Sequence, residues 1–476
     1  MISQRMYLAL LGLSTLALSA CGGGDGGSAA PAPPEVARPP PDSAPPTPDV
    51  LLSDAQLQTG ADANAARVDD DAAAWFAANA KTVRSLTVDD DFSDLDFLAD
   101  VLESKRLVAL GESSHGVKQF SQAKVRLIKY LHEALGFNLL AFEGGLFDCE
   151  YAQGILERGL ARDAMNSCLF SVWQTAELRE LFDYLVSTQS TATPLRITGF
   201  DVQFSGVNSD QRPAELERMV AKVSPAYAEE VLELEQRFFA AIGAAQAATS
   251  ASSNAITSLT DAVPGLQVDY TTLSDYLLAN ETIIVGDGEY TPLQVRIAAQ
   301  YTRTAPFFAS QLAQRFTNTF GASERDRGMG ENLIALATQI YPQEKIIAWA
   351  HNAHLRHQGT GFLPDANMGV FVHDLLEPQL YTVGFYMYRG QHAFNDRSVQ
   401  QVLAPLNFSL EAIFHSRRLA YLFLDIEGAD PDAEGGAWLR TTTPTWEWGS
   451  EQTPLTLSEE YDGVLVIDTV TPPDYL

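Results

Sequence analysis

Short apolar runs alternate with helical patterns along most of this chain, and this alternation constrains the fold more than any other feature. Brief apolar runs bounded by turn signals are typical of buried strands, and strands that alternate with helices are typical of a parallel sheet. The predicted strands cover residues 107–110, 137–142, 195–200, 345–350, 380–387, 419–425 and 463–468. The sequence therefore predicts an α/β fold with a central, mostly parallel sheet flanked by helices.

Several of these runs are followed at once by acidic, amide or imidazole side chains. In open α/β sheets, ligands bind beyond the carboxyl ends of the strands, so side chains at these ends are candidates for one shared site. The residues in question are Glu112 and His115, then Glu143, then Asp201 and Gln203, and finally His351 and His354. Histidine titrates near neutral pH and can take a proton from water. The nearby serines are interpreted mainly as helix N-caps.

The first 50 residues predict targeting and tethering rather than folded structure. Residues 1–20 have the pattern of a signal peptide, with an apolar run too short to span a bilayer. The sequence 18–21, Leu-Ser-Ala-Cys, resembles the lipobox of bacterial lipoproteins, which implies cleavage before Cys21 and acylation of Cys21. Residues 21–50 would then be a Gly- and Pro-rich tether. An ordinary secretory signal remains the alternative.

Gly22 rather than aspartate follows Cys21, which favours anchoring in the outer membrane, facing the periplasm. Residues 51–476 are expected to form one α/β body with a helical insertion at about 209–319, where long helical patterns rich in Ala, Glu and Leu appear. The formal charge of -30 argues against nucleic-acid binding and against contact of the folded part with an anionic membrane. Membrane contact is therefore expected only through the lipid.

Two cysteines besides Cys21 are present in a chain expected to be exported. Disulfides persist in such compartments, so Cys149 and Cys168 are predicted to pair. Neither belongs to a CxxC sequence, which argues against redox catalysis.

Familiar catalytic motifs are missing from the sequence, including GxSxG, HExxH, the Walker loop and GxGxxG. Ser113 or Ser114 stays possible as a nucleophile. A zinc or manganese site drawn from the candidate histidines and carboxylates also stays open, but no standard ligand spacing supports it. We expect no metal and no cofactor.

The strand-end motifs together resemble the erythromycin esterase family. The resemblance rests on the GExxHG sequence at 111–116, Phe-Glu at 142–143, Gly-Phe-Asp-Val-Gln at 199–203, Arg-Asp at 325–326 and Trp-Ala-His-Asn-Ala-His at 349–354, and it runs from about residue 90 to 472. It implies an α/β body with a helical subdomain capping a cleft, and ester hydrolysis without a metal. It also implies that His115 is the activating histidine, that Glu112 and Glu143 are its acidic partners, and that His351 is a second essential histidine, with His354 as its neighbour.

We expect a hydrolase that cleaves a small ester or lactone by attack of water activated by His115. Lys124, Arg126 or His351 would stabilise the oxyanion, with His354, Asp201 and Gln203 as further substrate contacts. The family often has arginine where this chain has Lys124, and lysine lacks the planar fork of arginine. This difference bears on whether a macrolide is the substrate. The alternatives are a non-catalytic binding lipoprotein and an esterase for acylated envelope sugars.

Overall fold

The computed structural model describes residues 70–89, 91–316, 321–358, 367–403, 405 and 409–476. The predicted signal peptide, the lipidation site at Cys21 and the tether lie outside these residues and stay predictions. The chain divides into units 1–48 and 49–476, and everything below concerns the second unit. Among the described residues, no helix is both long enough and apolar enough to cross a bilayer.

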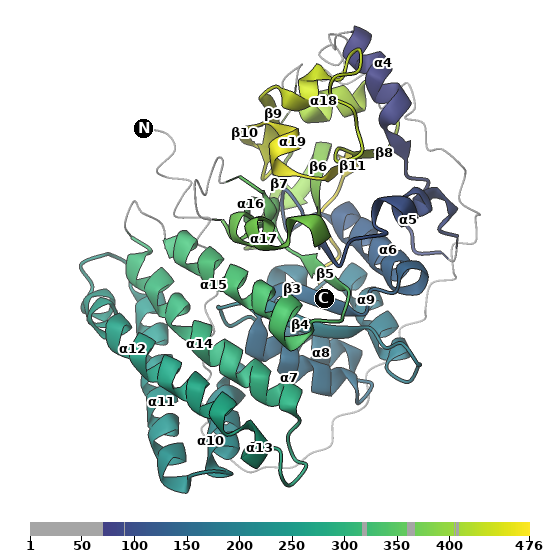
Figure 1. Ribbon diagram of the computed structural model, residues 1–476. Coiled ribbons are helices and arrows are strands. Elements are labelled where there is room, and N and C mark those ends of the chain that lie inside the picture. The colour runs from purple at the N-terminus through teal and green to yellow at the C-terminus, as the bar shows by residue number, and fades with distance from the viewer. Residues whose placement is uncertain (1–69, 90, 317–320, 359–366, 404, 406–408) are drawn as a thin grey trace, which may run out of the picture. The chain divides into compact units, whose positions relative to one another are not determined.

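Within the described residues, the core of this unit is a nine-stranded sheet with the order β1-β8-β11-β6-β2-β5-β3-β4, and β7 pairs with β6 (Figure 1). The strands are β1 (Lys81–Thr82), β2 (Leu107–Leu110), β3 (Leu139–Gly145), β4 (Arg196–Asp201), β5 (Ile346–Trp349), β6 (Leu380–Ala393), β7 (Val399–Gln401), β8 (Tyr421–Asp425) and β11 (Gly463–Val470). The six adjacent strands β11, β6, β2, β5, β3 and β4 are parallel, while β8, β1 and β7 are antiparallel to their neighbours. This confirms the predicted fold class.

Helices that precede or follow the strands cover the sheet: α4 (Asp70–Asn79), α5 (Phe97–Val101), α6 (Lys118–Leu135), α7 (Leu146–Leu156), α8 (Ala161–Cys168) and α9 (Ala176–Thr188). Helix α6 shows why the sequence folds this way. Its apolar residues recur at helical spacing, so that Phe120, Ile128 and Leu131 are buried in the same cluster as strand residues. The helix ends at Gly136, whose left-handed φ of 72° suits glycine at a C-cap.

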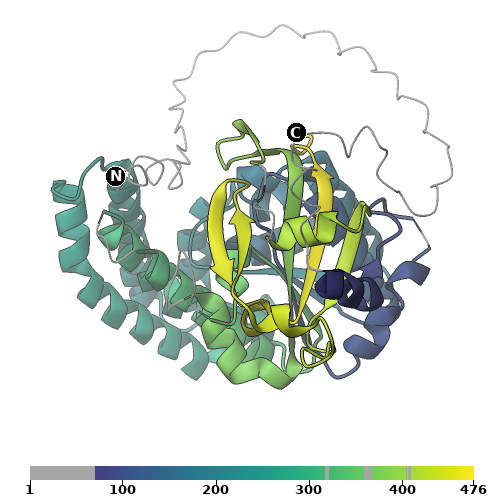
Figure 2. The ribbon, with the colours of Figure 1, turned by 90° about the horizontal axis from the view of Figure 1, so that it is seen from above.

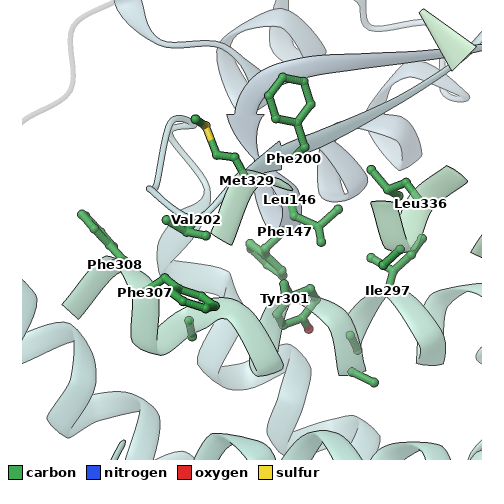
Figure 3. Packing of buried hydrophobic residues seen from close by; sticks show 14 of the residues in the cluster. Leu146, Phe147, Phe200, Val202, Ile297, Tyr301, Phe307, Phe308, Met329 and Leu336 are labelled. Carbon is green, nitrogen blue, oxygen red and sulfur yellow. The ribbon is translucent and has the colours of Figure 1, made fainter. Parts of the chain in front are cut away.

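Between β4 and β5 the chain forms α10 (Arg212–Ala221), α11 (Pro225–Ala247), α12 (Asn254–Ala279), α13 (Glu281–Ile284), α14 (Pro292–Gln314) and α15 (Gly321–Ala335), and α15 continues into a π-helical turn (Leu336–Ile340). One buried cluster joins these helices to the sheet. It packs Phe200 and Val202, at the end of β4, against Phe307 and Phe308 of α14 and Met329 of α15 (Figure 3). The helices are therefore anchored beside the carboxyl ends of the strands.

The last third of the chain adds α16 (Asn352–Leu355), α17 (Met368–Leu376), α18 (Leu410–His415), an antiparallel hairpin of β9 (Thr443–Glu447) and β10 (Glu451–Leu455), and α19 (Leu457–Glu460). Figure 2 shows α4, in purple, beside yellow-green and yellow segments from the C-terminal part of the chain. A third buried cluster accounts for this contact, because it joins Trp75 and Phe76 to Phe414 and Leu455. The hairpin of β9 and β10 was not predicted from the sequence.

The predicted disulfide between Cys149 and Cys168 is present and joins α7 to α8. We expect replacement of both cysteines by alanine to lower the free energy of unfolding by about 2–4 kcal/mol, because the cross-link restricts the unfolded chain. Urea denaturation with and without reductant measures this effect. The reductant should destabilise the natural chain and leave the double variant unchanged; equal curves for the natural chain would contradict the prediction.

Candidate active site

The strand-end residues singled out by the sequence converge on one place in the structure. His115 follows β2, Glu143 lies in β3, and His351 follows β5, and these three strands are neighbours in the sheet. The ring centroids of His115 and His351 lie 5.1 Å apart. Both side chains are largely buried, and His115 is 8% exposed. The two imidazoles are therefore close enough to act on one small molecule.

Glu112 is the carboxylate that orients His115. Its Oε1 lies 2.7 Å from Nδ1 of His115 and accepts a hydrogen bond from Trp173 Nε1 at 3.0 Å, while its Oε2 accepts one from Lys124 Nζ at 2.7 Å. Because Nδ1 donates its proton to this carboxylate, Nε2 is the nitrogen that is free to act as a base. In many enzymes a carboxylate of another residue fixes the tautomer and the orientation of the histidine that acts as the general base.

Lys124 holds Glu112 and does not face a substrate. Its side chain is fully buried, and Nζ lies 4.2 Å from the centroid of the Trp349 ring. The expected substrate contact of Lys124 is therefore corrected to a contact with a protein carboxylate. Lysine in place of the family's arginine changes the support of Glu112, so the planar fork of arginine does not bear directly on substrate recognition.

Burial lowers the pKa of Lys124 to about 8, although Glu112 favours the charged form. The ammonium is therefore present below pH 8 and lost above it. We expect activity to fall as the pH rises through about 8, because Glu112 then loses its cationic partner. A pH profile of kcat/KM measures this limb. Lys124→Arg should move the limb to higher pH, since arginine keeps its charge; an unmoved limb would contradict the assignment.

A second group of charges lies at the ends of β3 and β4. Arg325 donates to Oε1 of Glu143 at 2.7 Å and to Oδ2 of Asp201 at 2.6 Å. His354 is bound between acids, with Nδ1 2.7 Å from Oδ1 of Asp326 and Nε2 3.4 Å from Oε1 of Glu143. Asp201, expected to contact substrate, is therefore engaged by Arg325.

Burial opposes the charged forms in this group, but the neighbouring charges outweigh it. Although burial lowers it, the pKa of His354 is raised to about 10 by Asp326 and Glu143. Burial raises the pKa of Glu143, but the charges of His354 and Arg325 outweigh burial and hold this pKa well below its usual value. His354 is therefore a cation at neutral pH and Glu143 an anion, and neither is poised to exchange protons.

His351 has the opposite character. Its Nδ1 accepts a hydrogen bond from the backbone N–H of Ala353 at 3.1 Å, and its own backbone N–H donates to Oε2 of Glu143 at 2.8 Å. Burial lowers the pKa of the imidazole well below its usual value. His351 is therefore neutral, and because Nδ1 is an acceptor, the ring proton lies on Nε2. This side chain can donate a hydrogen bond to an oxygen.

Two predicted substrate contacts lie elsewhere. Arg126 donates to Asp94 and to the backbone oxygen of Ser85, because residues two positions apart in α6 point to opposite sides of the helix. The prediction that Arg126 stabilises the oxyanion is therefore wrong. The amide of Gln203 donates to Gln311 of α14 at 2.9 Å. Gln203 thus joins the sheet to the inserted helices.

Sequence reasoning missed several side chains that surround the two histidines. Trp448 stacks on His351 with ring centroids 4.6 Å apart. Trp173 and His115 make a T-shaped contact with ring centroids 4.7 Å apart. Ser114 Oγ lies 3.0 Å from Nδ1 of His392, and both residues are buried. Arg325 could have been predicted, because the Arg-Asp pair at 325–326 is one of the motifs that the family resemblance rests on. No sequence motif indicated the two tryptophans.

Across the part of the chain that the structure describes, no group of three or more His, Cys, Asp or Glu side chains is arranged to hold a metal ion. The candidate histidines are instead bound to carboxylates or backbone groups of the protein.

Comparisons with known proteins identify a family and similar folds for this chain. The family model described as erythromycin esterase matches residues 132–470. The putative hydrolase YbfO of Bacillus subtilis is 31% identical over 399 residues, which cover 80% of this chain and 87% of that protein. A crystal structure of a Bacillus cereus protein is similar with a TM-score of 0.71 at 20% identity, covering 85% of this chain and 98% of that one. A mutant of the erythromycin esterase EreC in its open conformation matches with a TM-score of 0.62 at 18% identity, covering 83% and 98%.

Proposed function

The chain belongs to the erythromycin esterase family, and on that premise we propose that this hydrolase cleaves a carboxylic ester or lactone by attack of a water molecule that His115 activates. One observation carries the proposal. Nδ1 of His115 is held by Glu112 at 2.7 Å while its ring lies 5.1 Å from that of the neutral His351. A base and a hydrogen-bond donor thus face the same small space.

In the proposed reaction, Nε2 of His115 takes a proton from water, and the resulting hydroxide attacks the carbonyl carbon. The carbonyl oxygen becomes an oxyanion, and Nε2–H of His351 donates to it. When the carbon–oxygen bond breaks, the imidazolium of His115 returns its proton to the leaving alkoxide. Glu112 stabilises the imidazolium between these two steps.

A panel of macrolides, simple lactones, aryl esters and acylated sugars tests the proposal. We expect hydrolysis of at least one class, with a rate unchanged after exhaustive chelation, because the proposed chemistry uses only protein side chains. Silence across the whole panel would favour the alternative of a ligand-binding protein. Activity confined to acylated sugars would identify the envelope-sugar alternative as the substrate class.

The buried pair of Ser114 and His392 offers a competing nucleophile, and Ser114→Ala separates the two mechanisms. With water as the nucleophile, this variant keeps its activity within about tenfold, since no covalent intermediate forms on the serine. Accumulation of an acylated Ser114 in single-turnover experiments with the natural chain would show that the serine, and not water, attacks first.

A further inference from the structure

The turn between β9 and β10 brings two side chains to the histidines from far along the chain. The backbone N–H of Trp448 donates to the backbone oxygen of Ser113 at 2.7 Å, which ties the turn to the loop that carries His115. Glu447, next to it, is 4% exposed, and its Oε1 accepts a hydrogen bond from the hydroxyl of Tyr386 at 3.2 Å. These two hydrogen bonds therefore tie the hairpin to the loop after β2 and to strand β6.

Trp448 adopts a backbone conformation that a bulky residue rarely takes. Its φ is 53°, in the left-handed region, which is energetically unfavourable for a residue with a large side chain. The contacts that hold it there are the bond to Ser113 and the stacking of its indole on His351, with an interplanar angle of 17°. Strain of this kind concentrates at functional sites.

Two buried polar atoms, one of them on the histidine that stacks on this indole, lie near each other. Nε2 of His351 and Oε2 of Glu447 lie 3.9 Å apart, too far for a hydrogen bond between them. Within the described residues, neither atom has a hydrogen-bond partner. Burying such an atom without a partner is unfavourable, so folded proteins rarely keep two of them close together unless another group binds there. An oxygen atom placed between them lies within hydrogen-bond reach of both.

The charges around Glu447 decide what kind of oxygen this is. Burial raises the pKa of Glu447 to about 7, and nearby Glu451 also raises it, while Arg356, the hydrogen bond from Tyr386 and the polar side chain of Asn352 lower it. Glu411 and Tyr461 are further titratable neighbours, and His351, whose pKa burial holds well below its usual value, lies near Oε2. Below pH 7 the carboxyl is therefore protonated, and because Tyr386 donates to Oε1, the proton belongs on Oε2. Two donors then point at the same oxygen.

We infer that Nε2–H of His351 and the protonated carboxyl of Glu447 form a two-donor oxyanion hole for the tetrahedral intermediate. The inference rests on the proposed function and adds Glu447 as a catalytic residue. No proton changes hands in this step: both donors bind the oxygen while it carries negative charge and release it when the carbonyl of the product forms. An ionised Glu447 would instead repel the oxyanion.

Glu447→Gln and Glu447→Ala test the donor pair. Glutamine keeps its oxygen toward Tyr386 and places an N–H donor where Oε2 stands, without a titrating proton. We expect kcat of the alanine variant to fall about 100- to 1,000-fold, the usual effect of removing one oxyanion donor, with little change in KM. The glutamine variant should stay within about tenfold of the natural chain, because an amide N–H replaces the lost donor.

The pH profile distinguishes this role from a structural one. In the natural chain, kcat should fall as the pH rises through about 7, because Glu447 loses its proton. In Glu447→Gln this limb should disappear, leaving the limb near pH 8 that belongs to Lys124. Glu451→Gln, in the same hairpin, is the matched control: it should keep the rate reached at low pH, while the limb moves somewhat below pH 7, because the charge of Glu451 helps to raise the pKa of Glu447.

Several outcomes would overturn the inference. A folded glutamine variant as inactive as the alanine variant would show that an ionised carboxylate is needed, and full activity of both would show a purely structural role. Infrared difference spectra at pH 6 should show a neutral carboxyl band that is missing from Glu447→Gln; its absence from the natural chain would also overturn the donor pair. Inactivity of the natural chain on the whole panel would overturn the proposed function itself.

Discussion

His115→Ala should lower kcat by about 100- to 10,000-fold, the usual consequence of losing a general base, and leave the fold intact. The fold should survive because Glu112 keeps its hydrogen bonds from Lys124 and Trp173 when the imidazole is removed. Without the imidazole, Glu112 remains bound to Lys124 and Trp173 and does not replace His115 as the base that takes the proton from the attacking water. Initial rates on the best substrate of the panel, with circular dichroism as a check of folding, measure the effect.

His132→Ala is the matched control for this experiment. His132 is also a largely buried histidine, on helix α6, but its ring is hydrogen-bonded to Tyr184 and to the backbone oxygen of Thr193, away from the site. Its replacement should leave kcat unchanged even where stability falls. If His115→Ala retained full activity in a folded protein, His115 would not be the base.

Arg325→Ala should destabilise the protein by about 3–5 kcal/mol, because removing one partner of a buried ion pair leaves uncompensated charge behind. Arg325 is 15% exposed, and it neutralises both Asp201 and Glu143, which are almost fully buried. Its loss also loosens Glu143, which accepts the backbone N–H of His351. Urea denaturation measures the stability, and kcat should fall together with it.

Arg296→Ala provides the comparison, because Arg296 pairs with Glu281 at the surface and is 47% exposed. Surface ion pairs contribute about 0–1 kcal/mol, so this variant should unfold almost as the natural chain does. Equal and small effects of the two substitutions would show that Asp201 and Glu143 find other partners or take up protons.

The sequence determined the strands and the chemistry at their ends. The buried strands β2, β4 and β5 lie within a residue or two of the predicted runs, because an apolar run between turn signals is a local property. Strand β6 extends to Ala393, beyond the predicted end at 387. Its last residues include several polar side chains, so the apolar run ends before the strand does. Pairing with β7 continues the strand. The convergence of His115 and His351 followed from the parallel order of the strands.

Which charged side chains pair with each other depends on the packing of the folded chain. Lys124 and Arg126 are indistinguishable as candidates in the sequence, yet one is bound to Glu112 and the other to Asp94, because the packing of α6 sets which face lies toward the site. Glu447 ends the first strand of a short hairpin and Trp448 begins its turn, and because each strand contains a proline, no local pattern predicts them. Contacts between residues so distant along the chain depend on how the whole chain packs, and local propensity holds no information about them.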